Sequence, residues 1–223
     1  MLITFSGIVG SGKSTNAKQA CRFLQDTGYS VVYFRFRFLT TQKIFQSLFT
    51  KKKTAVAPPS KEKPEKTKTE ATPRHRKLVK LTLARTFVYL WRILIFRLFA
   101  ALRLRRKIII IDRFYYDSLA HYSLTGCRER FYLTLLKKAL PVPNLAMMLL
   151  ARPQTILRRR PNYDGEYIHR LYRRYQQVAH EFPRVIVLRT DSLQDLTAII
   201  LQHVRQAVTR ERHGGPLPRQ VLQ

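Results

Sequence analysis

A glycine-rich loop near the start of the chain constrains the fold more than any other feature. Residues 7–14 read Gly-Ile-Val-Gly-Ser-Gly-Lys-Ser and match the pattern G-x-x-x-x-G-K-[ST] at every fixed position. The short apolar run at 2–6 is typical of a buried strand, and the segment from Lys13 to Thr27, which Gly28 ends, is typical of a helix. A strand, this loop and a helix in that order predict a site for the phosphates of a nucleoside triphosphate.

The residue types in this loop suit that chemistry. Glycines let backbone amides approach an anion closely, and the following helix directs the positive end of its dipole to the same place. Lys13 supplies a mobile cation for the terminal phosphates, and the Ser14 hydroxyl is suited to ligating Mg²⁺. The full match disfavours the alternative, a chance glycine turn. The predicted nucleotide-binding residues are Gly7, Gly10, Ser11, Gly12, Lys13, Ser14 and Thr15.

The other apolar segments alternate between strand and helix patterns. Strands are expected at 31–36, 107–111, 145–150 and 185–188, and helices at 117–139, 164–182 and from Asp191 to about residue 208. This order predicts a three-layer α/β/α architecture of the P-loop NTPase type, with a five-stranded parallel sheet. The chain of 223 residues suits one such domain, at 1–211, followed by a frayed tail at 212–223.

The chain is strongly basic, with 42 Lys and Arg against 13 Asp and Glu and a formal net charge of +29. Residues 51–77 hold ten Lys or Arg, three Glu and almost no large apolar residue, so they predict a basic, partly disordered insertion. This segment contributes +7, which leaves +22 on the rest of the chain. The excess of positive charge predicts a polyanionic partner: nucleotide phosphates, nucleic acid or an acidic membrane surface.

An apolar segment at 78–105 is punctuated by arginines and predicts one long helix. Its uncharged runs fall short of the roughly 20 residues that a membrane-spanning helix needs. Packing in the core and lying on a membrane surface both remain open. Cys21 and Cys127 are too few for a disulfide framework or a structural metal site, and residues 1–5 do not resemble a signal peptide, so we expect a cytoplasmic protein with reduced thiols.

The phosphate loop alone does not identify the phosphate acceptor. A switch GTPase requires an Asn-Lys-x-Asp-like segment, which the sequence lacks, and the apolar run at 108–111 ends in Asp112-Arg113 instead of the adjacent acids usual in oligomeric ATPases. The segment 112–122, Asp-Arg-Phe-Tyr-Tyr-Asp-Ser-Leu-Ala-His-Tyr, and the arginine run at 158–160 resemble the thymidylate kinase family of P-loop nucleoside and nucleotide kinases. The likeness covers residues 1–36 and 107–211.

The resemblance implies roles for individual residues. Asp112 is expected to help hold Mg²⁺ with Ser14, and Arg113 to contact the acceptor phosphate. The arginine run is expected to close over ATP and to neutralise charge during transfer. The catalytic set that follows is Lys13, Asp112, Arg113, Arg158 and Arg159, with Arg160 on ATP. Two alternatives remain: Asp112 and Arg113 form a structural ion pair, or the arginine run is a solvated helix face.

The chain also departs from the family pattern. The family's Arg-Glu-Pro-Gly-Gly-Thr-like segment is replaced by residues 35–41, Arg-Phe-Arg-Phe-Leu-Thr-Thr, which lack the acid. The expected substrate-binding residues are Arg35, Arg37, Arg85, Arg92, Arg113 and Tyr116. Spacing does not decide whether Arg85 or Arg92 is the family's arginine ahead of the Asp-Arg pair. An acceptor site so rich in arginine favours an acceptor that already carries a phosphate.

Three functions are compatible with these observations. The first is an ATP- and Mg²⁺-dependent kinase of a nucleoside monophosphate, with dTMP as the default acceptor and a role in nucleotide biosynthesis. The second is a P-loop ATP-binding protein that grips nucleic acid through its basic surface. The third is a membrane-surface kinase with a lipid-linked acceptor. The resemblance also makes a homodimer plausible.

Overall fold

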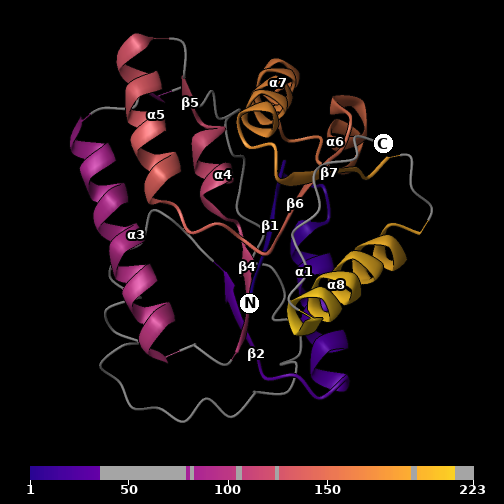
Figure 1. Cartoon of the computed structure of the whole chain (residues 1–223). Helices are drawn as coiled ribbons and strands as arrows, with labels where there is room; N and C mark the ends of the chain where they lie inside the picture. The colour runs from indigo at the N-terminus through magenta and orange to yellow at the C-terminus, as the bar shows by residue number, and fades with distance from the viewer. Residues whose placement is uncertain (36–78, 81–82, 104–106, 124–125, 192–194, 214–223) are drawn as a thin grey trace, which may run out of the picture.

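A five-stranded sheet forms the centre of the molecule in a computed structural model that describes residues 1–35, 79–80, 83–103, 107–123, 126–191 and 195–213 (Figure 1). The strand order is β2-β4-β1-β6-β7, and every neighbouring pair is parallel. The strands are β1 (Leu2–Gly7), β2 (Val31–Arg35), β4 (Ile108–Asp112), β6 (Leu145–Leu150) and β7 (Val185–Arg189). The predicted five-stranded parallel sheet is therefore confirmed.

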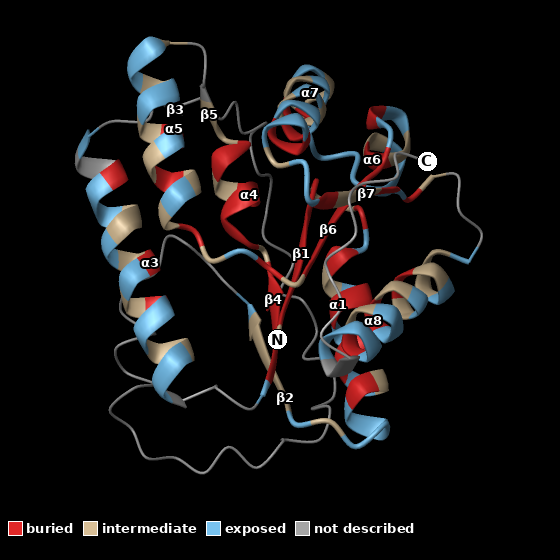
Figure 2. Cartoon of the chain, in the orientation of Figure 1, coloured by how far each residue is buried: buried red, intermediate tan, exposed pale blue. Residues whose placement is uncertain are grey.

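Helices cover both faces of this sheet, and the central strands are buried (Figure 2). Alternate residues of β4 enter opposite cores: Ile108 and Ile110 belong to one apolar cluster, Ile109 and Ile111 to the other. The first cluster includes residues of α1 (Lys13–Asp26) and α8 (Leu196–His213). The second includes residues of α3 (Leu83–Arg103), α4 (Tyr115–Leu119), α5 (Cys127–Ala139), α6 (Pro153–Arg159) and α7 (Gly165–Glu181). The three-layer α/β/α architecture follows.

The register brings functional segments together at one edge of the sheet. Phe5 of β1 pairs with Asp112 of β4, and Gly7 pairs with Leu149 of β6. Parallel strands direct their carboxyl ends the same way, and ligands of open α/β sheets bind outside these ends. The phosphate loop after β1 and the Asp-Arg pair at the end of β4 therefore lie side by side.

The prediction of one helix over 117–139 is wrong. The chain instead forms α4, a short strand β5 (Tyr122–Ser123) and α5. The first helix stops because the His121 amide bonds to the Ser118 carbonyl in a tight turn, and Gly126 is extended before α5 begins. β5 pairs in parallel with β3 (Val79–Lys80), a second sheet that the sequence did not predict.

Other boundaries differ from the expectations for similar local reasons. The long apolar helix begins at Leu83, after β3, and α8 begins at Leu196 instead of Asp191, whose carboxylate pairs with Arg152 at 2.9 Å. The unexpected helix α6 begins at Pro153, a residue well suited to a first helical position. The insertion at 51–77 and residues 214–223 of the tail lie outside the described residues. Among the described helices, none is long and apolar enough to cross a membrane.

Candidate active site

The phosphate loop joins β1 to α1 in a shape that requires glycine at one position and favours it at another. Gly7 has φ +144°, and a Cβ on it would lie 2.0 Å from the backbone oxygen of Leu149 in the neighbouring strand. Gly12, which precedes α1, has φ +78° and contributes no side chain to cap the helix. The amides of the first turn of α1 are therefore left for a ligand, as at other anion-binding helix starts.

Lys13 lies inside this loop. Its side chain is buried, and its Nζ donates a hydrogen bond to the Ile8 carbonyl at 2.9 Å. Burial lowers the pKa of Lys13, while the charges of Asp117 and Asp112 raise it. Two carboxylates thus support the charged form of the lysine, and the ammonium group lies where the loop would receive phosphates.

Asp112 ends β4 beside the loop and is fully buried. Its Oδ2 accepts a hydrogen bond from the Tyr33 hydroxyl at 3.0 Å and lies 3.6 Å from Nε of Arg35. The ion pair of Asp112 is therefore with Arg35, and not with Arg113 as in the alternative reading of the sequence. Within the described part of the chain, its buried Oδ1 has no hydrogen-bond partner.

This unpartnered oxygen fits a role in holding Mg²⁺. Magnesium commonly uses one or two protein oxygens together with substrate phosphates and water. Ser14, half-buried in the first turn of α1, offers a hydroxyl on the same loop. In the described ranges, no cluster of three or more His, Cys, Asp or Glu could hold a metal. A metal at Ser14 and Asp112 would therefore depend on the bound triphosphate for further ligands.

Arg113 has a strained backbone at the same strand end. It is the non-glycine residue of the described chain with a positive φ, at +71°, and its amide donates to the Phe5 carbonyl at 2.9 Å. Its buried Nε has no hydrogen-bond partner among the described residues. Burial lowers the pKa of Lys13 and the Arg113 charge lowers it further, so the two cations lie near each other. A bound anion would relieve this repulsion.

A buried carboxylate that sequence reasoning did not place in the site lies behind the loop. Asp117 of α4 accepts hydrogen bonds from the Gly7 amide at 3.2 Å and from the Tyr175 hydroxyl at 2.7 Å. Burial raises the pKa of Asp117, while Lys13 and these hydrogen bonds lower it. Asp117 thus connects α4, α7 and the loop. The sequence held one signal for this role of Asp117: it is an acidic residue within the apolar segment that follows the Asp-Arg pair.

Arginines from the end of α6 reach the loop from the other side. Arg159 donates from Nη1 to the Gly10 carbonyl at 3.1 Å. The side chain of Arg160 also covers Gly10, since its Cγ lies 3.7 Å from the place of a Cβ there. Arg158, in the last turn of α6, is exposed. Two of the three arginines therefore contact the loop. The alternative that the run is a solvated helix face fits Arg158, but not Arg159 and Arg160.

The expected substrate-binding residues are only partly brought together. Arg35 and Arg113 flank Asp112. Arg92 of α3 is half-buried near α4: burial raises the pKa of Tyr115 there, and the Arg92 charge opposes this rise. Arg85 lies in α3 and Arg37 follows β2, but the side chain of Arg85 and the whole of Arg37 are outside the described part.

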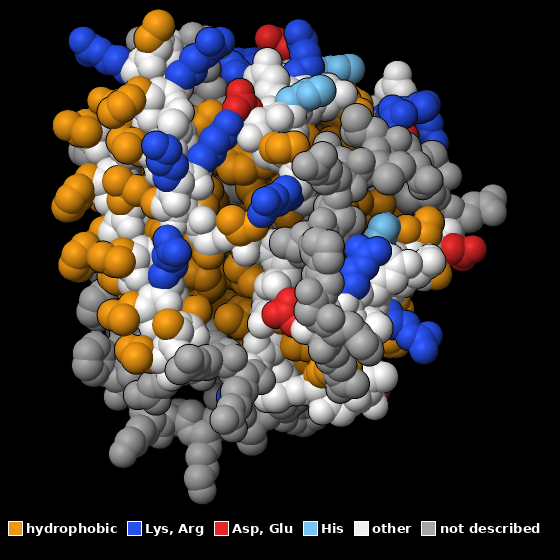
Figure 3. Space-filling view, viewed as in Figure 1, with side chains coloured by type: hydrophobic (Ala, Val, Ile, Leu, Met, Phe, Trp, Pro, Cys, Tyr) orange, Lys and Arg blue, Asp and Glu red, His pale blue; other side chains and the backbone are white. Residues whose placement is uncertain are grey.

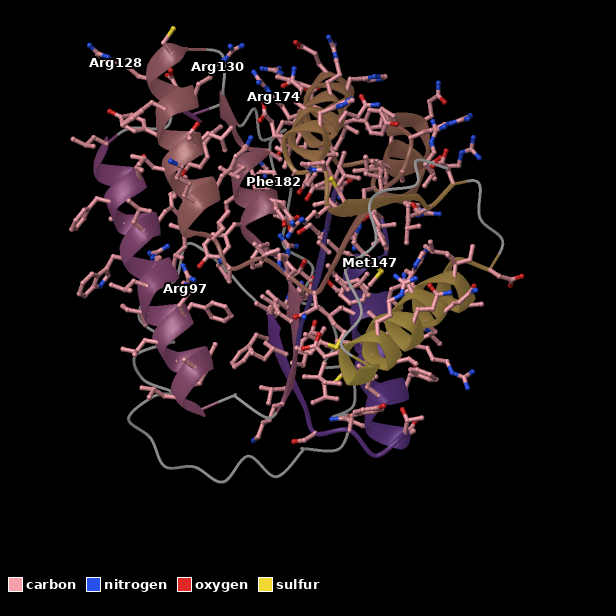
Figure 4. All side chains as sticks on the ribbon, viewed as in Figure 1. Arg97, Arg128, Arg130, Met147, Arg174 and Phe182 are labelled. Carbon is pink, nitrogen blue, oxygen red and sulfur yellow. The ribbon has the colours of Figure 1, made fainter. Side chains whose placement is uncertain are left out.

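Tyr116 differs from the expectation. Its ring is buried and packs against Phe114 at 5.0 Å and Phe182 at 4.8 Å between ring centroids. Phe182 follows α7 and lies beside α4 in the view with side chains drawn (Figure 4). Tyr116 is therefore a core residue, and the tyrosines that hydrogen-bond to carboxylates of the site are Tyr33 and Tyr175.

Comparison with known proteins supports the fold. No family model and no curated protein match the sequence. Among solved structures, thymidylate kinase from Ehrlichia chaffeensis matches with a TM-score of 0.51 and 18% sequence identity, over 93% of this chain and 98% of that chain. At this identity the likeness shows a fold like that of P-loop kinases, and it leaves activity and substrate to the chemistry of the site.

Proposed function

We propose that the protein is an ATP- and Mg²⁺-dependent phosphotransferase that moves the γ-phosphate of ATP to a small phosphorylated acceptor. The observation that carries this proposal is the convergence of two distant segments on one phosphate loop. Lys13 lies in the loop, Asp112 and Arg113 end the adjacent strand, and Arg159 reaches Gly10 from α6. Cations placed around a triphosphate are what phosphoryl transfer requires of a protein.

The same arrangement explains why no separate general base is needed. Oδ2 of Asp112 is engaged by Tyr33 and Arg35, and its Oδ1 is the oxygen that would hold Mg²⁺, so this carboxylate is poorly placed to take a proton from a hydroxyl acceptor. A monophosphate acceptor is already ionised near neutral pH and can attack the γ-phosphorus through an oxygen that carries no proton. The new P–O bond forms as the bond to the bridging oxygen of ADP breaks. An acceptor with its own phosphate therefore suits these residues better than a free hydroxyl.

Each residue then has a defined task. Lys13 and the loop amides hold the triphosphate, and Ser14 with Asp112 would hold Mg²⁺, which neutralises phosphate charge. Arg113 binds the acceptor phosphate, with Arg35 and Arg92 as further candidates. Arg159 and Arg160, which contact the loop, stabilise the charge that develops on the transferred group, and Arg158 is a further candidate for this task. The matching solved structure is that of a thymidylate kinase. The acceptors to test are therefore nucleoside monophosphates, beginning with dTMP.

The test is a transfer assay with γ-labelled ATP and Mg²⁺ across the common nucleoside monophosphates. We expect labelled diphosphate from at least one acceptor, and a loss of at least about 100-fold in turnover for Lys13→Ala. Lys18→Ala is the matched control, because Lys18 is an exposed lysine of the same helix. Labelled product from no monophosphate, or a Lys13→Ala variant as active as Lys18→Ala, would contradict the proposal.

A further inference from the structure

The helix α6, whose end carries the arginines that reach the phosphate loop, packs against α7. In turn, α7 lies between α6 and α4 and contacts both (Figure 1). Cδ1 of Leu157 in α6 lies 3.6 Å from the place of a Cβ on Gly165, the first residue of α7. Figure 3 shows Lys and Arg side chains on the surface over these two helices. The two helices form one packed pair beside the loop.

α6 is too short to hold its arginines in place by itself. It has seven residues, and within the described part of the chain no side-chain hydrogen bond caps its start. Isolated helices of this length are not stable in water, so α6 depends on packing. α7 has 17 residues, and the Asp164 carboxylate caps its start by accepting from the Glu166 amide at 3.1 Å. The places of Arg159 and Arg160 over the loop therefore follow the place of α7.

A buried tyrosine ties α7 to the start of the loop. The Tyr175 hydroxyl donates to Oδ1 of Asp117 at 2.7 Å, and the same oxygen accepts from the Gly7 amide at 3.2 Å. Burial raises the pKa of Tyr175 and the Asp117 charge raises it further, so the hydroxyl keeps the proton that it donates. Apolar contacts alone tolerate small shifts of a helix, whereas a buried hydrogen bond requires a narrow range of distances and angles. This bond therefore fixes α7 relative to the loop.

The helix pair thus meets the loop at two points. One contact is direct, from Arg159 of α6 to the Gly10 carbonyl at 3.1 Å. The other runs from Tyr175 of α7 through Asp117 to the Gly7 amide. Because α6 and α7 are packed together, a change at the second contact must also move the arginines at the first.

We propose that Tyr175, by its hydrogen bond to Asp117, positions Arg159 and Arg160 over a bound triphosphate. Tyr175 is a positioning residue, because its side chain is buried and its hydroxyl is engaged by Asp117 behind the loop. The inference rests on the proposed function, since that function assigns the two arginines to the triphosphate. The competing explanation is that the Tyr175 hydrogen bond only stabilises the fold.

Tyr175→Phe removes the hydroxyl and keeps the ring. We expect kcat of transfer to fall by about tenfold and MgATP affinity by about threefold, because displaced arginines stabilise the phosphate charges less well. Arg113, the acceptor residue, follows β4 outside the helix pair, so KM for the acceptor should change by less than about threefold. Tyr172→Phe is the matched control, because Tyr172 is a half-buried tyrosine of the same helix outside the contact with Asp117.

A double-mutant cycle separates positioning from stabilisation of the fold. Arg159→Ala combined with Arg160→Ala removes the groups that Tyr175 is proposed to position. In that background, Tyr175→Phe should change kcat and MgATP affinity by less than about twofold, because no arginine is left to displace. A tyrosine that only stabilises the fold would give the same fold-change in both backgrounds. Circular dichroism at the assay temperature checks that every variant is folded.

Transfer and nucleotide binding are measured separately, so the inference and the proposed function can fail independently. If no acceptor is phosphorylated, the proposed function fails, and the cycle is decided by calorimetric titration with MgATP. The positioning role is overturned if Tyr175→Phe behaves like Tyr172→Phe. It is also overturned if the effect of Tyr175→Phe persists in full without the two arginines, or if the acceptor KM rises while kcat is unchanged. A folded parent that binds no MgATP would overturn both proposals.

Discussion

Removal of the Asp117 carboxylate should destabilise the protein through the two hydrogen bonds that end on it. Asp117→Ala leaves the Gly7 amide and the Tyr175 hydroxyl without their buried acceptor. At about 1–3 kcal/mol for each unsatisfied donor, the free energy of unfolding should fall by about 2–6 kcal/mol. Asp117→Asn keeps an acceptor oxygen, so its cost at neutral pH should be within about 1 kcal/mol. Tyr175→Phe removes one donor and should lie between the two.

The charge of Asp117 gives this prediction a second readout. Burial raises the pKa of Asp117, so the folded state retains a proton at pH values where the unfolded state, with a pKa of about 3.9, has already released it. Stability must then fall as pH rises between the unfolded pKa and the higher folded pKa. Asp117→Asn lacks this slope. The unfolding free energy of the variant minus that of the parent should therefore increase with pH across this window.

The assay is urea unfolding followed by circular dichroism, repeated from pH 4 upward for the parent, Asp117→Asn, Asp117→Ala and Tyr175→Phe. The reasoning is refuted if Asp117→Ala costs less than about 1 kcal/mol or if Asn is as damaging as Ala, because neither result is compatible with two buried hydrogen bonds to one oxygen. If the unfolding free energy of Asp117→Asn minus that of the parent falls as pH rises, the direction of the pKa shift is refuted.

Three further perturbations test other parts of the site and of the fold. Arg113→Gln should lower kcat/KM for the phosphorylated acceptor by about 100-fold while changing MgATP affinity by less than about threefold, as steady-state kinetics and calorimetry would show. Gly7→Ala should cost at least about 3 kcal/mol in thermal or urea unfolding, because its Cβ would meet the Leu149 oxygen at 2.0 Å. Arg152→Ala should lower the free energy of unfolding by no more than about 1 kcal/mol in the same assay. The Arg152 side chain is largely exposed, so water screens its ion pair with Asp191.

The sequence predicted the segments whose structure is decided locally. The loop pattern and the apolar runs around it placed β1 and α1 correctly, and the run at 145–150 matches β6. These strands are buried on both faces, so they appear in the sequence as unbroken apolar runs. The domain boundaries at 1–211 and 212–223 stay predictions, and α8 itself continues to His213.

Other features depend on contacts that no local pattern encodes. The short strands β3 and β5 are two residues each and stabilise one another across about 40 residues of chain. Asp117 meets Gly7 over a sequence separation of 110 residues, and Arg159 meets Gly10 over 149. Tyr116 was expected to bind substrate, yet its position on α4 directs it into the aromatic core. Periodicity indicated that α3 is a helix but did not show that its apolar residues face two ways.

Calorimetric titration with MgATP tests the central claim of a triphosphate site most directly. The loop geometry predicts saturable binding at one site per chain, strengthened by Mg²⁺, retained in Lys18→Ala and weakened at least about tenfold in Lys13→Ala. Folded protein that binds no nucleoside triphosphate with Mg²⁺, or that binds it equally well without Lys13, would contradict the account.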